Sequence, residues 1–328
     1  MMANDKEISS NKISIKNLFM SWEWMLVVIF IIVNIINSVI SPYYLNAGQL
    51  LNATTTFLAE TFIVFPMVFI LILGEIDISV GSTVALSSVI MGVLYKAGLP
   101  MAVAILISLA VGVVCGLING LLIVKFNLSS IIVTFTTMTL YRGLCYAILK
   151  DQAVGNFPSW YKYFGWGSVV GIPYMLIAFV IVAIIYGLIL HKTTFGRYVY
   201  AMGNNITASR YSGIKVDKIK LIIFILTGLM ASVTSIFLTS IMGSTRPDVA
   251  LGYEMDVITM AVFGGVSTAG GKGGIIGPII SIFIIGLLHY GLGLINIPST
   301  TMLIVVGALL IFSVMIANIN QNKSRKNF

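Results

Sequence analysis

Long apolar runs separated by short polar stretches dominate the chain. They cover about 24–40, 57–74, 81–97, 100–124, 129–149, 173–190, 218–242, 274–295 and 299–317, and a shorter glycine-rich run covers about 255–270. A helix needs about 20 apolar residues to cross the hydrocarbon core of a bilayer, so each long run predicts one membrane-spanning helix. The pattern predicts an all-α polytopic integral membrane protein with about ten transmembrane helices, counting a short or broken one near 255–270.

The composition excludes several classes of soluble protein. Of 328 residues, 58% are hydrophobic and only 9% are charged, and the mean hydropathy is +1.03. Average soluble domains carry about 25% charged residues. An ordinary cytosolic enzyme, a nucleic-acid-binding domain and a disordered chain are therefore excluded. Residues 1–23 are polar and mixed in charge, which is unlike a cleavable signal peptide, so we expect the first apolar run to be retained.

Basic residues gather in three clusters that predict the orientation in the membrane. The clusters consist of Lys6, Lys12 and Lys16; of Lys192, Arg197, Arg210, Lys215, Lys218 and Lys220; and of Lys323, Arg325 and Lys326. Such clusters favour the cytoplasmic side. An even number of spans separates successive clusters if 255–270 counts as a crossing. We expect cytoplasmic tails at 1–23 and 319–328, and one transmembrane domain at 24–318 whose cytoplasmic loop is about 191–217.

The same orientation places 41–56, about 150–172 and 243–254 on the outer side. The second of these segments is rich in aromatic residues, namely Phe157, Trp160, Tyr161, Tyr163, Phe164 and Trp166. The simpler interpretation is an aromatic belt at the membrane interface. The alternative is an outer helix that closes a pore or docks a partner.

Three glycines at four-residue spacing, Gly112, Gly116 and Gly120, form one face of a predicted helix. Small residues in this pattern allow another helix to approach closely. Asn119 adjoins the face, and both helix packing and a polar pathway remain open for it. Cys115 and Cys145 lie in apolar runs and are interpreted as packed thiols.

The stretch GEIDISVGS at 74–82 predicts a break between two helices. Acidic residues at membrane depth are costly and point to function, but Asp77 or Ser79 can also cap the next helix. Capping is the favoured interpretation. A proton or cation site is the alternative.

The run at 129–149 is the most polar of the predicted spans. Thr134 and Thr137 can bond back to their own helix, so threonines alone are weak evidence of a site. Arg142 is unusual in a span and has three interpretations: a side chain that reaches outward, a structural pair, or a fork of donors for a hydroxylated substrate. The candidate translocation pathway comprises Asn119, Thr134, Thr137, Tyr141 and Arg142.

The loop at 191–217 is too long for a tight turn and too apolar for a solvated linker. Residues 206–212 suit a short amphipathic helix bounded by Gly203 and Gly213. Such a helix on the cytoplasmic face would press on a soluble partner, or would lie on lipid headgroups.

No motif supports chemistry by this chain. The stretch GGVSTAGGKGG at 264–274 fails the P-loop pattern, because Val266 replaces the first glycine and Gly273 follows the lysine. A turn between closely packed helices is the favoured interpretation. His191 and His289 lack metal-ligand spacing, so we expect neither a metal site nor a catalytic site.

Taken together, the motifs resemble the permease subunits of ATP-binding-cassette (ABC) importers for simple sugars of the ribose, xylose and rhamnose type. Those carrying the resemblance are GEIDISVGS at 74–82, GLINGLL at 116–122, IIVTFTTMTLYRGL at 131–144, TTFGRYVYAMGNN at 193–205, ARYSGIKVDKIK at 208–220 apart from Ser209, and GGVSTAGGKGGIIGPIIS at 264–281. They occur in family order and cover about 60–318.

The resemblance implies the partners. A second permease copy or a sister permease completes the pathway, two cytoplasmic ATPases use ATP and magnesium, and an extracytoplasmic binding protein delivers the sugar. This chain itself would bind no cofactor, and it would lie in a bacterial cell membrane among lipids. In this family one segment of the permease contacts the ATPase and couples the two subunits. The resemblance implies that role here for Gly196, Arg197, Gly203, Asn204, Ala208, Arg210 and Gly213.

Two features bear on the subfamily. Glu75 departs from the glycine that the family often has there, which leaves open whether that segment has the same surroundings. The stretch 243–254 looks most like the rhamnose and autoinducer-2 permeases. The main rival class is an ion-coupled secondary transporter of a small polar solute, for which Glu60, Glu75 and Asp77 are the candidate ion ligands in the first half.

Overall fold

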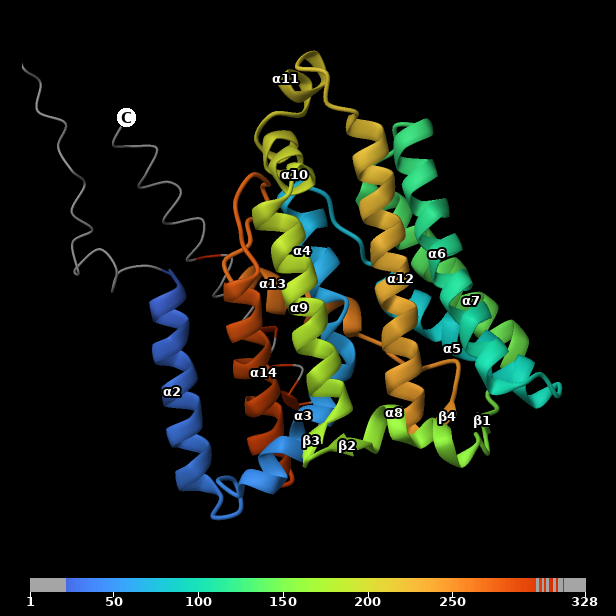
Figure 1. The fold of residues 1–328 in the computed structure, drawn as a ribbon, viewed down its shortest axis with the longest axis vertical. Coiled ribbons are helices and arrows are strands. Elements are labelled where there is room, and N and C mark those ends of the chain that lie inside the picture. The colour runs from blue at the N-terminus through green and yellow to red at the C-terminus, as the bar shows by residue number, and fades with distance from the viewer. Residues whose placement is uncertain are drawn as a thin grey trace, which may run out of the picture.

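A computed structural model describes residues 22–298 and the single positions 301, 302, 304, 307, 308, 311 and 315. Almost all of the predicted tail 1–23, most of the apolar run 299–317 and the tail 319–328 lie outside the described residues. The described part is a bundle of helices that run roughly along one long axis (Figure 1).

Nine of the predicted apolar runs form helices in the described part of the chain. Six helices are long and apolar enough to span a membrane: α2 (Trp22–Ile40), α6 (Met101–Lys125), α7 (Ser130–Leu149), α9 (Tyr174–Lys192), α12 (Val216–Met242) and α14 (Ile276–Leu294). Two further helices, α3 (Ala47–Thr61) and α4 (Val64–Ile72), meet at 41° and together make a seventh candidate span. The prediction of a polytopic helical membrane protein is confirmed for this part.

Two further helices from the predicted apolar runs are shorter than these candidate spans. Helix α5 (Val80–Lys96) has 17 residues and α13 (Tyr253–Phe263) has 11. At 1.5 Å per residue, α13 is about 16 Å long, roughly half of a bilayer core. The apolar run predicted at 255–270 is therefore a short helix followed by a non-helical turn.

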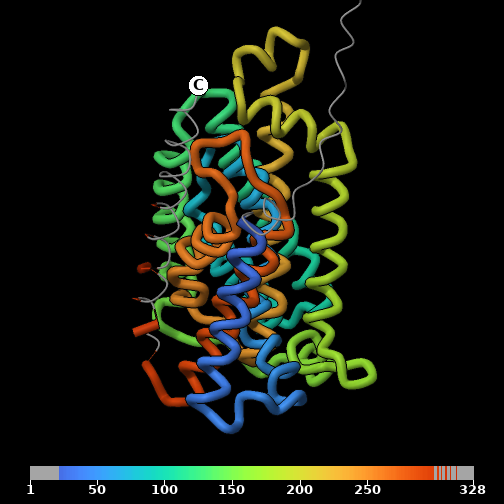
Figure 2. The backbone as a smooth tube through the Cα atoms, turned by 90° about the vertical axis from the view of Figure 1, so that its left-hand side faces the viewer, coloured from blue at the N-terminus to red at the C-terminus, as the bar shows by residue number. Residues whose placement is uncertain are grey.

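The two ends of the bundle carry different connections. Helices α10 (Thr194–Asn204) and α11 (Ile206–Tyr211) lie at one end, called here the α10 end (Figures 1 and 2). The opposite end holds α8 (Lys162–Trp166), the 3-10 helix η1 (Ser159–Tyr161) and four two-residue strands: β1 (Val154–Gly155), β2 (Ser168–Val169), β3 (Ile172–Pro173) and β4 (Ser244–Thr245). Strand β1 pairs antiparallel with β4, and β2 with β3.

The aromatic segment at this opposite end is anchored to α12. Tyr161 is fully buried, and its hydroxyl lies 2.8 Å from the Ile236 carbonyl oxygen and 2.6 Å from the Thr239 hydroxyl. Trp160, Tyr163 and Trp166 remain exposed. The indole of Trp166 also donates to the Ile241 carbonyl of α12, at 3.2 Å. The segment is thus held on α12 while several of its aromatic side chains face outward, as at a membrane interface.

Helices α6 and α12 pack backbone to backbone along the predicted glycine face. A side chain at Gly116 would overlap the Phe224 carbonyl, and one at Gly112 would overlap Ser232 and the Gly228 carbonyl. Gly120 lies against Leu221. The predicted close helix packing is confirmed, and Cys115 and Cys145 are both buried, as predicted.

Much of the outer surface is apolar. Large aliphatic and aromatic side chains are exposed along α2, α7 and α9, including Ile35, Ile132, Phe135, Ile181 and Ile184. An apolar surface this extensive is unfavourable in water and suits lipid or another membrane subunit.

The glycine contact gives a stability prediction. Replacing Gly116 with valine should separate α6 from α12, because the added side chain meets the α12 backbone, and overpacking costs about 1–3 kcal/mol. Thermal unfolding in mild detergent should show a lower midpoint. Gly143→Val is the matched control, since it also places valine inside a helix but meets no atom within 4 Å. Equal midpoints for the two variants would contradict the packing argument.

Candidate functional site

The loop after α9 folds into two capped helices. The Thr193 hydroxyl accepts a hydrogen bond from the Gly196 amide at 3.3 Å, and the Asn205 side chain accepts one from the Ala208 amide at 2.9 Å. Such caps satisfy amides that the first helical turn leaves free. Helix α11 confirms the predicted short helix at 206–212. Helix α10 is an additional element, so Gly203 lies within a helix rather than at the boundary predicted for it.

Gly203 is the point at which α10 touches the bundle. A side chain there would overlap the Ile72 carbonyl at the end of α4 and come within 2.6 Å of the Gly271 amide. That amide donates a 2.8 Å hydrogen bond to the same carbonyl. The turn between α13 and α14, residues 264–275, is called here the glycine turn. Helix α10 therefore sits directly on the junction of α4 and the glycine turn.

Side chains strengthen this contact. The Tyr200 hydroxyl donates a 2.6 Å hydrogen bond to the Gly273 carbonyl, and partial burial raises the pKa of Tyr200, which keeps the phenol protonated as a donor. Phe195 packs against Phe69 of α4, with ring centroids 6.2 Å apart. Helix α10 is thus bound both to α4 and to the glycine turn.

The seven predicted coupling residues divide into two groups. Gly196 and Gly203 face inward, where Gly196 allows the sharp corner beside the Leu190 carbonyl. The other five are exposed at the α10 end: Arg197, Asn204, Ala208, Arg210 and Gly213. Tyr211, which the prediction did not include, is 88% exposed beside them. The inner group fixes the segment and the outer group is accessible to another protein.

Residues 73–79 form a non-helical connection between α4 and α5, called here the break segment. Ser79 occupies the cap position of α5, but its side chain makes no capping bond. Instead, an Asp77 carboxylate oxygen accepts hydrogen bonds from the Ser79 amide at 2.8 Å and the Ser79 hydroxyl at 2.7 Å. Asn119 of α6 donates to the same hydroxyl at 2.8 Å. The polar groups predicted at the break thus bind one another and hold the start of α5.

Helix α7 supplies further partners for the break segment. The Ile76 amide donates to the Ser130 hydroxyl and the Ile78 amide to the Thr134 hydroxyl, both at 3.3 Å. Thr137 bonds back to the Val133 carbonyl at 3.0 Å. Ser130 and Thr134 therefore serve a backbone that lacks helical partners, whereas Thr137 bonds within its own helix.

The remaining pathway candidates also bind within the chain. The Tyr141 hydroxyl donates to the Cys115 carbonyl at 3.2 Å. Arg142 donates to the carbonyls of Pro247 and Val249 at 2.7 and 2.8 Å. Of the three interpretations of Arg142, the structure supports a structural role. Its guanidinium group holds the segment before α13. Asn119 keeps one unused acceptor, its Oδ1 atom, which is buried without a hydrogen-bond partner among the described residues.

The first turns of α5 and α13 meet inside the bundle. A side chain at Gly81 would overlap the carboxylate of Glu254 and come within 2.6 Å of the Ala250 carbonyl. The stretch 243–254, predicted to lie outside, therefore turns inward after β4. Helix starts that meet within a membrane domain occur at the binding regions of many transporters.

The acidic residues proposed for an ion-coupled transporter have other surroundings. Glu75 forms an ion pair with Lys220 of α12, and Asp77 binds Ser79. Glu60 is buried on α3, close to Asp256 of α13. Among the described residues, no group of three or more potential metal ligands occurs.

Comparisons with known proteins identify the family. The family of permease components of branched-chain amino acid transport systems matches residues 49–314. The chain belongs to this family. It is also 34% identical over 301 residues to the autoinducer 2 import system permease protein LsrD of Escherichia coli K12 and of Shigella flexneri, which covers 90% of this chain and 91% of each relative. No solved structure matches it.

Family membership and the helical bundle together settle the general role. The chain is the permease subunit of an ABC importer, a multi-pass protein of the bacterial cell membrane and a transport component rather than an enzyme. The resemblance inferred from the motifs is confirmed.

The contact between Tyr200 and Gly273 gives a local prediction. Tyr200→Phe removes one hydrogen bond of about 1 kcal/mol, so the glycine turn should open about fivefold more often. Hydrogen exchange of peptides covering 264–275 would measure this. Tyr198→Phe is the control, because Tyr198 is exposed on the same helix. Equal exchange in both variants would contradict the anchoring role of Tyr200.

Proposed function

We propose that this chain forms half of a pathway for a sugar-like solute, and that autoinducer-2 is its substrate. The relatives named above are autoinducer 2 import permeases, and the similarity extends over nine tenths of the chain. The resemblance of 243–254 to the rhamnose and autoinducer-2 permeases supports the same substrate class. A second permease, two ATPases that use ATP and magnesium, and an extracytoplasmic binding protein complete the importer.

The proposed topology has ten crossings with both termini in the cytoplasm. The seven candidate spans, the shorter helices α5 and α13, and the apolar run at 299–317 together give this number. The α10 end would face the cytoplasm, because it carries the central basic cluster. The tails at 1–23 and 319–328 would then lie beside the ATPases.

The observation that carries the coupling proposal is the position of Gly203. Helices α10 and α11 would receive the ATPase on their exposed residues. Movement of α10 would reach the bundle through Gly203, because this backbone touches both α4 and the glycine turn. ATP-bound and nucleotide-free states would favour opposite openings of the pathway. The translocation role of Asn119, Thr134, Thr137, Tyr141 and Arg142 remains a prediction. It is supported by the contacts of Asn119 and Thr134 with the break segment and of Arg142 with the segment before α13.

Capture of the partners tests the substrate. A tagged chain extracted gently from its native membranes should retain an ABC ATPase and a binding protein, identifiable by mass spectrometry. The captured binding protein should bind autoinducer-2 more tightly than rhamnose or ribose. Preference for one of the two sugars would contradict the proposed substrate, and recovery of a chain without an ATPase would contradict the proposed assembly.

Replacing Gly203 tests the coupling segment. Gly203→Leu should push α10 away from the Ile72 carbonyl, and substrate-stimulated ATP hydrolysis by the assembled importer should fall about tenfold. Gly187→Leu on α9 is the control, because no atom lies within 4 Å of the added Cβ. Both variants should reach the membrane in normal amounts. Normal transport by Gly203→Leu would place the coupling contact elsewhere.

A further inference from the structure

The ion pair between Glu75 and Lys220 is largely buried, unlike the Arg210–Asp217 and Arg246–Asp248 pairs. Three ion pairs occur among the described residues. The Glu75 and Lys220 side chains are 17% and 14% exposed, against 66% and 59% for Arg210 and Asp217. Exposed pairs contribute little, whereas removing one member of a buried pair leaves a charge without compensation. Glu75 and Lys220 therefore depend on each other.

The backbone fixes Glu75 to the end of α4. The Glu75 amide donates a 3.1 Å hydrogen bond to the Ile70 carbonyl, and the Gly74 amide a 2.9 Å bond to the Leu71 carbonyl. Gly74 has a φ of 75°, which turns the chain out of the helix. The Glu75 carboxylate is thus held where α4 ends, two residues after the Leu73 position that closes the helix.

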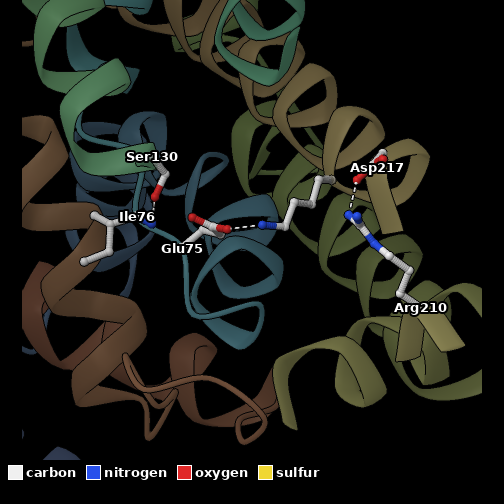
Figure 3. A network of polar contacts seen from close by, with 6 residues as sticks. Glu75, Ile76, Ser130, Arg210 and Asp217 are labelled. Carbon is white, nitrogen blue, oxygen red and sulfur yellow. Dashed lines mark hydrogen bonds and ion pairs between the residues drawn. The ribbon is translucent and has the colours of Figure 1, made fainter. Parts of the chain in front are cut away.

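Lys220 connects this carboxylate to the α10 end. It lies one turn into α12, whose first turn also carries Asp217, the partner of Arg210 on α11 at 2.8 Å (Figure 3). Lys220, Asp217 and Arg210 line the same cavity of about 360 Å³ between α6, α11 and α12. Lys220 therefore lies at the corner where α11 meets the start of α12.

Ile76, the residue after Glu75, contacts α7 rather than α12. The Ile76 amide bonds to Ser130 of α7, as Figure 3 shows beside Glu75. The break segment is therefore attached to α12 at Glu75, to α7 at Ile76 and Ile78, and to α6 at Ser79. A relative movement of α12 and α7 acts between these two neighbouring residues.

We propose that Glu75 and Lys220 form a latch that joins the α11–α12 corner to the break segment. They are positioning residues for transport, and the proposal rests on the coupling function proposed above. With the latch closed, the first residues of the break segment follow the start of α12. Without it, the α11–α12 corner moves while the break segment keeps its bonds to α6 and α7.

Distances within the assembled importer test the latch. Spin labels on Tyr198→Cys of α10 and Ile132→Cys of α7 report the movement, because both positions are exposed while Cys115 and Cys145 are buried. The wild-type background should show a change in the label-to-label distance when ATP and magnesium are added. Glu75→Gln and Lys220→Met should each reduce that change, and the double variant E75K/K220E should restore it. The conservative variants Glu75→Asp and Lys220→Arg should retain more of it than the neutral ones.

Lys218→Met is the matched control. It removes the same charge from the same turn of α12, but Lys218 is exposed, so the distance change should persist. A change that survives both Glu75→Gln and Lys220→Met would overturn the latch alone. Equal losses of the distance change in the neutral, conservative and charge-exchanged variants would also overturn it. Such a result would mean that the packing of these side chains matters and the ion pair does not. Absence of any change in the wild type would overturn the latch together with the coupling segment.

Discussion

The whole arrangement depends on satisfying a helix break inside an apolar bundle. Backbone groups without partners are costly where water is scarce, so a non-helical stretch at this depth needs hydrogen bonds from elsewhere. The break segment obtains them from three sources: the Asp77 carboxylate, the Ser130 and Thr134 hydroxyls of α7, and the last turn of α4. This need accounts for two of the polar residues of α7. The hydroxyl groups of Ser130 and Thr134 lie where the neighbouring backbone lacks helical partners.

Glycines join the helices around the break segment into two closely packed units. Between α6 and α12 they bring two backbones into contact, so these helices form one closely packed unit. At Gly203 the same property joins α10 to α4 and the glycine turn, which makes a second unit. A contact between backbones leaves no flexible side chain to absorb a displacement. Movement within either unit is therefore passed on rather than dissipated.

The sequence predicts the local features well and the long-range ones poorly. Apolar runs located the helices, and the spacing of Gly112, Gly116 and Gly120 identified a packing face, because both patterns depend on neighbouring residues. Helix α10 was missed, since its glycines and threonines are typical of loops and its stability comes from contacts with Phe69 and Gly273. Arg142 could not be assigned either, because its carbonyl partners lie more than a hundred residues away in the chain. Contacts of this kind leave no periodic signal.

The two packed units meet at the break segment, and this meeting explains why a buried ion pair is suitable there. A transporter has to exchange one packed arrangement for another, and two rigid units need a connection that is firm in one state and separable in the next. A contact between apolar side chains could be equally stable, but it would be less specific, because many apolar side chains could replace one another in it. A carboxylate and an ammonium group that are both shielded from water pair specifically with each other. If either one packs against an apolar group instead, both charges lose their compensation. Pairing of Glu75 with Lys220 therefore adds a specific contact between the end of α4 and the start of α12, where, among the described residues, no glycine contact joins them.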